Sequence, residues 1–186
     1  MIDIERIMQT EIPDIAAVYG GVRGRTMSSR HQSYAWPILV EAGVKRIIDL
    51  READQSDRLP RLCQHYGLEY FHYPIDNAAK TIKQMAKLFS SFCEMIDKED
   101  SYIACAMGLH RTDIALCTYW VFYAADKGIA PPSIRGYREK DGHNTNKIMR
   151  VLNAFYLFKT EQESKDPIHI ETFKERKKII NELSKQ

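Results

Sequence analysis

Apolar and polar residues follow one another along this chain in blocks that predict both strands and helices. Short apolar or alternating runs are typical of buried strands, and longer stretches with apolar residues at three- and four-residue spacing are typical of amphipathic helices. The predicted strands cover residues 18–22, 44–50, 68–74 and 102–104. The predicted helices cover residues 34–43, 59–65, 80–97, 111–126, 132–139 and 146–159, and an exposed helix is expected from Glu171 onward.

The order of these elements predicts an α/β fold. Strands that alternate with helices form a parallel sheet with helices on both faces. We therefore expect a central, mostly parallel, twisted sheet of four to five strands flanked by helices. Ligands of such sheets bind beyond the carboxyl ends of the strands, and the junction between Ala104 and Cys105 is one such end.

Length and composition indicate an ordinary globular domain. The chain has 186 residues, of which 44% are hydrophobic and 28% are charged, as in most globular domains. We expect one domain over residues 1–186, with a core at about 18–158 and a helical tail over 159–186. The net charge of +2 is too small to indicate a nucleic-acid partner. No apolar run approaches the roughly 18 residues of a membrane span, and the charged N-terminus does not resemble a signal peptide, so a cytoplasmic protein is expected.

The cysteine pattern argues against a metal site and leaves free thiols. None of the four cysteines, Cys63, Cys93, Cys105 and Cys117, is part of a C-x-x-C pair, so neither a zinc site nor a redox dithiol is predicted. Thiols stay reduced in the cytoplasm. We expect three of them to be core residues and Cys105 to be the reactive one.

The segment from Cys105 to Thr112 joins the last predicted strand to an apolar helix. A loop that curls before a helix N-terminus presents unpaired N–H groups, which form a nest for an anion. Gly108 permits the tight curvature, and the guanidinium of Arg111 can bind two phosphate oxygens at once. The expected phosphate-binding residues are Ala106, Met107, Gly108, Leu109, His110 and Arg111.

The same surroundings predict a nucleophile. Thiols in electropositive settings ionise more readily, and the thiolate is the attacking form. Cys105 is therefore the expected nucleophile, and the hydroxyl of Thr112 can donate to its sulfur and later stabilise it as a leaving group. Proximity and fixed donors are the main sources of catalysis in phosphoryl transfer.

The sequence CAMGLHRT resembles the signature of the protein tyrosine phosphatases: a cysteine, five residues with a central glycine, an arginine, and a serine or threonine. The stretches VKRIIDLRE and YFHYPIDN are similar to parts of the small, atypical dual-specificity branch, and the resemblance covers about residues 18–158. It implies the cysteine phosphatase fold and hydrolysis of phosphate monoesters through a phosphocysteine intermediate on Cys105, without a metal or other cofactor.

A phosphate ester also needs an acid that protonates its leaving oxygen. Asp76 is the first candidate, because it follows a predicted strand at the same sheet edge as Cys105 and because the resemblance implies an acid at this place. Asp54 and Asp57 follow another strand at that edge and remain alternatives. Asp76 can instead cap the helix that begins near Lys80.

Two positions depart from the family pattern. Ala104 stands where the resemblance implies a histidine that orders the loop, and Asp113 stands where many relatives have glycine. A carboxylate at position 113 opposes phosphate binding unless its side chain points away and holds a neighbouring loop. His110 either adds positive charge to the rim or bonds a neighbouring loop. Asp49 and Arg51 are expected to be structural.

These observations predict a cysteine-dependent phosphatase that acts on phosphotyrosine, with phosphoserine and phosphothreonine as further substrates. The alternatives are an inositol-phosphate phosphatase, a phosphate-binding pseudophosphatase and a sulfurtransferase of the rhodanese type. Ala106 and Leu109 occupy places where phosphoinositide phosphatases often carry lysines, which disfavours a highly charged substrate. The expected partner is a phosphorylated protein or small phosphorylated molecule, with neither nucleic acid nor membrane and with a monomer as default.

Overall fold

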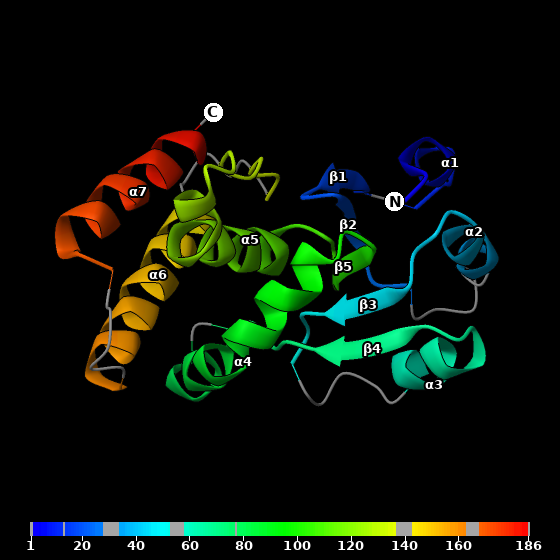
Figure 1. Cartoon of the computed structure of the whole chain (residues 1–186), viewed down its shortest axis with the longest axis horizontal. Helices are drawn as coiled ribbons and strands as arrows, with labels where there is room; N and C mark the ends of the chain where they lie inside the picture. The colour runs from blue at the N-terminus through cyan, green and yellow to red at the C-terminus, as the bar shows by residue number, and fades with distance from the viewer. Residues whose placement is uncertain are drawn as a thin grey trace. The chain divides into compact units, whose positions relative to one another are not determined.

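The computed structural model describes residues 2–12, 14–27, 34–52, 58–76, 78–136, 143–162 and 168–185. The strands are β1 (Ala16–Val18), β2 (Gly21–Arg25), β3 (Arg46–Asp49), β4 (Glu69–His72) and β5 (Ser101–Cys105). The helices, shown in Figure 1, are α1 (Ile4–Met8), α2 (Ala35–Glu41), α3 (Arg58–His65), α4 (Ala79–Asp97), α5 (His110–Phe122), α6 (His143–Gln162) and α7 (Ile170–Leu183), with a short 3-10 helix, η2 (Ala124–Lys127). None of the helices in these ranges combines the length and the apolar character that crossing a bilayer demands.

The five strands form one sheet in the order β1-β2-β5-β3-β4. Only β1 pairs antiparallel, and the other three pairings are parallel. The predicted α/β fold with a mostly parallel sheet flanked by helices is thereby confirmed. Ala104 lies between Gly24 and Asp49 in register, and Asp49 lies opposite His72. The carboxyl ends of β3, β4 and β5 therefore share one edge of the sheet.

The chain divides into two compact units. The first comprises Met1–Pro74 and Ser90–Thr112, and it contains the whole sheet. The second comprises Ile75–Phe89 and Asp113–Gln186. The prediction of one domain over residues 1–186 with a helical tail stays a prediction.

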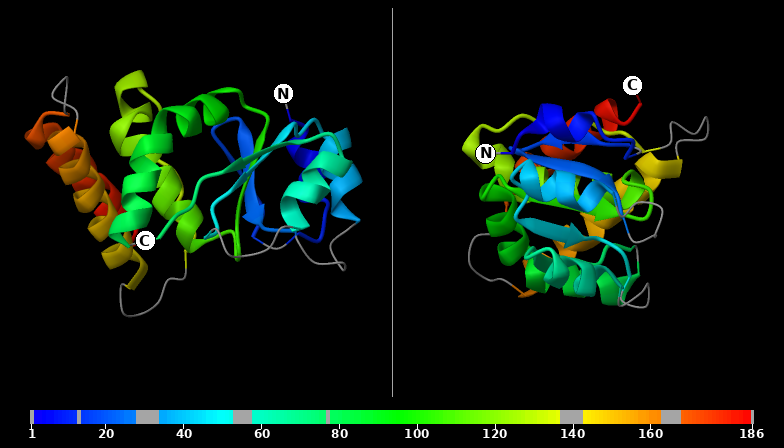
Figure 2. Two further views of the ribbon diagram at one scale, coloured as in Figure 1. Left: turned by 90° about the horizontal axis from the view of Figure 1, so that it is seen from below. Right: turned by 90° about the vertical axis from the view of Figure 1, so that its right-hand side faces the viewer.

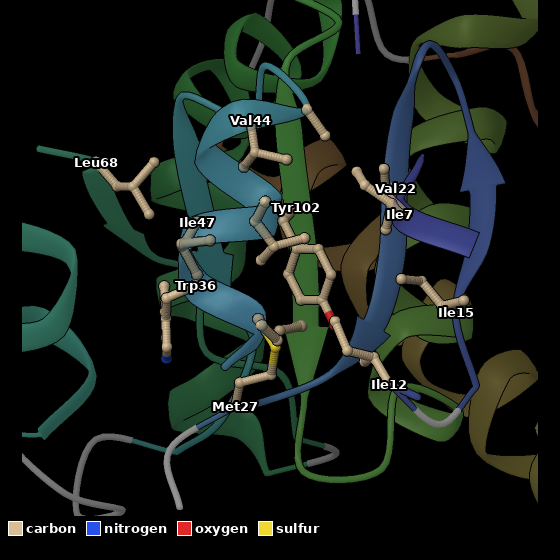
Figure 3. Packing of buried hydrophobic residues seen from close by; sticks show 14 of the residues in the cluster. Ile7, Ile12, Ile15, Val22, Met27, Trp36, Val44, Ile47, Leu68 and Tyr102 are labelled. Carbon is tan, nitrogen blue, oxygen red and sulfur yellow. The ribbon is translucent and has the colours of Figure 1, made fainter. Parts of the chain in front are cut away.

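The core of the first unit lies between one face of the sheet and helices α1, α2 and α3. Tyr102 in β5 lies between Val22 in β2 and Ile47 in β3, as the strand register requires (Figure 3). Trp36 from α2 is 1% exposed and stacks on Tyr66 with ring centroids 5.8 Å apart. Burial of a large apolar side chain contributes roughly 1.5–3 kcal/mol, so this cluster stabilises helices too short to persist alone.

The second unit has an aromatic core of its own. Helices α6 and α7 run side by side in Figure 1 and in the left-hand panel of Figure 2, and they are in contact. Phe173 of α7 stacks on Tyr156 of α6 with centroids 4.3 Å apart, and Arg176 donates to the carbonyl of Val121 at 2.6 Å. Phe173 and Ile180 are buried. The expectation of an exposed C-terminal helix was wrong in this respect, because one face of α7 packs on its own unit.

Two predicted elements differ from the structure. The single strand expected over 18–22 is a hairpin of β1 and β2, whose turn residues Tyr19 and Gly20 have φ values of 47° and 74°. Two positive φ angles are typical of the type I′ turn, which matches the twist of hairpin strands. The helix expected over 132–139 is absent from residues 132–136, which follow Pro131 without regular structure, and the remainder lies outside the described residues.

Candidate active site

The 105–112 loop begins at the carboxyl end of β5 and enters the first turn of α5. The carbonyl of Cys105 accepts from the amide of Thr26 at 2.9 Å and from the amide of Gly108 at 3.2 Å. Cys105 is 3% exposed, whereas Ala106 and Met107 are exposed. The loop therefore turns back tightly over its own nucleophile candidate, and its tip faces outward.

Gly108 lies directly on the main chain of β2. Its φ is 71°, and a Cβ at this position would lie 2.5 Å from the carbonyl carbon of Gly24 and 2.8 Å from the amide nitrogen of Arg25. Real Cβ atoms do not approach main-chain atoms this closely, since the contact is well inside the sum of the van der Waals radii. Both the dihedral angle and the close approach thus require glycine. The sequence analysis predicted the first requirement but not the second.

The strand beneath the loop is equally tightly fitted. A Cβ on Gly24 would lie 2.3 Å from the hydroxyl oxygen of Tyr102. That hydroxyl donates to the carbonyl of Arg25 at 2.8 Å. Burial, and then the charge of Cys105, raise the pKa of Tyr102 far above its usual value, so the hydroxyl stays protonated and remains a donor.

The main chain of the loop is oriented by a buried arginine. One terminal nitrogen of Arg23, in β2, donates to the carbonyl of Gly108 at 3.0 Å and to that of Leu109 at 3.2 Å. Within the parts of the chain that the structure describes, no main-chain carbonyl accepts from the amides of Ala106, Met107 or Leu109. Such amides are the donors that an anion in the loop would use.

Thr112 lies against the sulfur of Cys105. Its hydroxyl oxygen is 3.4 Å from Sγ, and both side chains are buried. The hydroxyl is placed to donate to the sulfur, the role that the sequence predicted for it. A donor in this position stabilises negative charge on sulfur.

Arg111 is paired with a residue that the sequence analysis did not select. Its Nη2 donates to Oε1 of Glu52 at 2.8 Å. The side chains are 26% and 42% exposed, so the pair adds less than about 1 kcal/mol to stability. Glu52 follows β3 at the predicted sheet edge, and this position was the signal that could have identified it.

Asp49 and Arg51 are structural, as predicted. The guanidinium of Arg51 donates to both oxygens of Asp49, at 2.9 Å and 2.8 Å, and both residues are buried. The Tyr70 hydroxyl donates to Asp49 at 3.0 Å, and Nε2 of His72 lies 2.6 Å from the carbonyl of Arg51. This network fixes the turn that leads from β3 to Glu52.

Asp113 holds a loop of the second unit. It is 1% exposed and accepts from the amides of Arg135 at 3.1 Å and Gly136 at 2.5 Å. The side chain is therefore engaged with a neighbouring loop, which is one of the two arrangements expected from the sequence. Its charge is balanced by two main-chain donors.

The remaining predicted site residues are placed as follows. Asp76 is half-buried and lies beyond β4, at the start of the segment that leads into α4; its role as the acid stays a prediction. Asp54 and Asp57 lie outside the described residues. His110 is half-buried and is the first residue of α5.

The other three cysteines are core residues, as predicted. Cys63, Cys93 and Cys117 are at most 2% exposed. Burial and the nearby charge of Asp49 raise the pKa of Cys63 to about 12, so this thiol stays protonated at neutral pH and is a poor nucleophile.

Comparison with known proteins finds neither a matching family model nor a matching curated protein. Solved structures that are similar to this chain include the kinase associated phosphatase with its catalytic-site cysteine changed to serine. It is 13% identical, at a TM-score of 0.48, over 96% of this chain and 99% of the other. TpbA of P. aeruginosa is 11% identical, at a TM-score of 0.46, over 75% and 86%.

The Yvh1 phosphatase domain of Chaetomium thermophilum is also similar, with 14% identity and a TM-score of 0.39 over 90% of this chain and 94% of the other. Two of these three structures are named as phosphatases, and the third is named only as TpbA. The likeness concerns the fold.

Replacing Gly108 with alanine should destroy the loop geometry. We expect Gly108→Ala to lose binding of tungstate, an oxyanion probe, because the added Cβ collides with the main chain of β2. Gly67→Ala is the matched control: φ is 68° and nothing lies within 4 Å of its added Cβ, so it should cost only about 1 kcal/mol. Tungstate titration and urea unfolding measure both effects. Equal behaviour of the two variants would contradict the close contact.

Replacing Asp113 tests its structural role. Asp113→Ala removes the acceptor of two main-chain amides and should lower the free energy of unfolding by about 1–3 kcal/mol. Asp113→Asn keeps one side-chain oxygen as acceptor and should cost less. Urea unfolding of the two variants beside the native chain measures this order. An alanine variant as stable as the native protein would show that the two hydrogen bonds contribute nothing.

Proposed function

We propose that this protein is a cysteine-dependent phosphatase that hydrolyses phosphate monoesters at the 105–112 loop. The observation that carries the proposal is the 3.4 Å contact between the Thr112 hydroxyl and the Cys105 sulfur, inside a tight loop that also contains Arg111. A nucleophile with an adjacent donor, main-chain amides and a guanidinium are the components that phosphoryl transfer requires.

The reaction would proceed in two displacements. The Cys105 thiolate attacks phosphorus, the bond from phosphorus to the ester oxygen breaks, and the departing oxygen takes a proton from Asp76. Water then attacks the phosphocysteine, gives its proton to Asp76 and releases inorganic phosphate. The sulfur leaves as a thiolate, and the Thr112 hydroxyl stabilises it.

Arg111 would bind the phosphate while Glu52 holds its side chain. Among the residues that the structure describes, the guanidinium donates from one of its nitrogens, Nη2, to Glu52 at 2.8 Å. A guanidinium has five N–H donors in a fixed plane, so the remaining ones are sufficient to bind two phosphate oxygens. Glu52 therefore fixes the direction of the side chain before substrate arrives, which lowers the entropy lost on binding.

The loop composition favours a substrate with a single phosphate group. Its exposed tip consists of Ala106 and Met107, and Leu109 is buried. A carboxylate, Glu52, lies beside Arg111. A second or third phosphate would meet these uncharged side chains and this acid, so phosphotyrosine or phosphoserine and phosphothreonine are favoured over an inositol polyphosphate.

Hydrolysis of para-nitrophenyl phosphate tests the nucleophile. Cys105→Ser should lower kcat by about a thousandfold or more, because a serine hydroxyl is far less ionised than a thiol. Arg111→Lys should lower kcat/KM by about a hundredfold, because an ammonium cannot replace the bidentate fork. Metal chelators should have no effect.

Cys63→Ser is the matched control for Cys105→Ser, since it makes the same chemical change at a buried thiol and should leave kcat intact.

If the native protein binds tungstate but shows no turnover between pH 5 and 8, it is a phosphate-binding pseudophosphatase and the enzymatic proposal is wrong.

Asp76→Asn tests the general acid. The variant should lose about 10²–10⁴-fold in kcat with phenyl phosphate, whose leaving oxygen needs a proton, and much less with para-nitrophenyl phosphate. An acid acts in its protonated form, so activity of the native enzyme should fall as pH rises through the acid's pKa, and the variant should lack that limb. Equal losses with both esters, or an unchanged profile, would leave Asp54 or Asp57 as the acid.

A further inference from the structure

Arg23 is a buried charge in the interior of the sheet. It lies in the middle of β2, beside Ile103 in register, and it is 1% exposed. Burying a guanidinium is costly unless it is hydrogen-bonded. Its terminal nitrogen donates to two successive carbonyls of the 105–112 loop, those of Gly108 and Leu109. The sheet thus retains an arginine where an apolar residue would be cheaper, and the residue contacts the loop.

The planarity of the peptide bond extends this contact to the loop amides. In a trans peptide unit the carbonyl and the following N–H point in opposite directions, and the described residues contain no cis peptide. When the carbonyl of Gly108 points to Arg23, the N–H of Leu109 points away from it. The carbonyl of Leu109 fixes the N–H of His110 in the same way. Arg23 therefore sets the direction of two amides that are predicted to bind phosphate.

The residues that lie in register beside the loop do not orient its carbonyls. Gly24 and Ala104, which pair with each other, have no polar side chain. Arg25, paired with Cys105, lies 3.8 Å from the carboxylate of Asp14 and has a side chain that is 31% exposed. Arg23, one residue before Gly24 in β2, is the side chain that donates to the carbonyls of Gly108 and Leu109.

We propose that Arg23 is a positioning residue of the phosphatase site: it holds the Gly108 and Leu109 carbonyls beneath the loop, so that the Leu109 and His110 amides face the bound phosphate. This inference rests on the proposed function. The buried positive charge also offsets part of the negative charge of the oxyanion, since Coulomb interactions are strong where water is excluded. The recorded contacts of Arg23 are with the loop carbonyls, so Arg23 is proposed to act through the loop main chain and through its charge.

Two substitutions separate the charge from the geometry. Arg23→Met removes both hydrogen bonds and the charge, and it should weaken tungstate binding by about tenfold to a hundredfold. Arg23→Lys keeps the charge but not the fork, and it should retain an intermediate affinity. The affinity is measured by calorimetric titration of the whole chain with tungstate.

Amide spectra give a readout that a merely structural role would not move. The ¹⁵N shift of an amide responds to hydrogen bonding at the preceding carbonyl, so Arg23→Lys should shift the signals of Leu109 and His110 in the free protein. If Arg23→Met does not fold, this measurement on Arg23→Lys decides the matter. Unchanged signals at both positions would overturn the proposal.

Arg46→Met is the control for loss of a buried arginine. Arg46 is 4% exposed and begins β3, at the opposite end of the sheet from Cys105, where its partners are Glu69 and Asp100. This variant should lose stability and keep the native affinity for tungstate. If Arg46→Met and Arg23→Met weaken tungstate binding equally, Arg23 acts only through stability and the proposal is wrong.

The outcomes also separate this inference from the proposed function. If the native protein hydrolyses para-nitrophenyl phosphate and Arg23→Met binds tungstate normally, the function stands and the role of Arg23 is refuted. If tungstate binding depends on Arg23 but no ester is hydrolysed, the role of Arg23 stands and the enzymatic proposal fails. A native protein that binds no tungstate overturns both.

Discussion

The candidate site depends on one contact, the packing of Gly108 against the main chain of β2. An added Cβ would lie 2.5 Å from the carbonyl carbon of Gly24, so no side chain separates loop and strand. Side chains can adjust their rotamers, but a main-chain contact between two parts of a sheet-anchored fold cannot give way without moving the strand. The parallel pairing of β2 and β5 thereby fixes the loop, and Tyr102 and Arg23 fill the space beneath it.

Three carboxylates in and around the loop and the neighbouring strand β3 are each engaged with a donor. Asp49 accepts from Arg51, Asp113 accepts from two main-chain amides, and Glu52 accepts from Arg111. A carboxylate whose hydrogen bonds are satisfied presents less charge to an incoming anion than an unpaired one. An aspartate at position 113 is therefore compatible with the proposed anion-binding loop. Glu52 is the most exposed of the three, so it is the one that a phosphate would affect directly.

Most of the fold could be predicted from the sequence, because the spacing of apolar residues within each segment and the order of the segments can be read directly along the chain. Strand-like runs and the amphipathic pattern of 80–97 correspond to β3, β4, β5 and α4. Holding a neighbouring loop was one of the two arrangements expected for Asp113. Arg23 was not foreseen, because an arginine inside a strand has no local signature and its meaning comes from a loop 85 residues away. The turn at Tyr19 was not predicted either, because a non-glycine residue rarely takes a positive φ.

The four cysteines show why residue type alone does not identify a nucleophile. Cys63 and Cys105 belong to the same unit and are both almost fully buried. Cys63 lies in the apolar cluster, and burial raises its pKa to about 12, with the charge of Asp49 adding to the shift. Cys105 instead lies at a strand end, with a hydroxyl donor against its sulfur and a loop of amides above it. Burial among apolar side chains keeps Cys63 protonated and a poor nucleophile, whereas Cys105 is buried beside the polar groups that the proposed reaction would use.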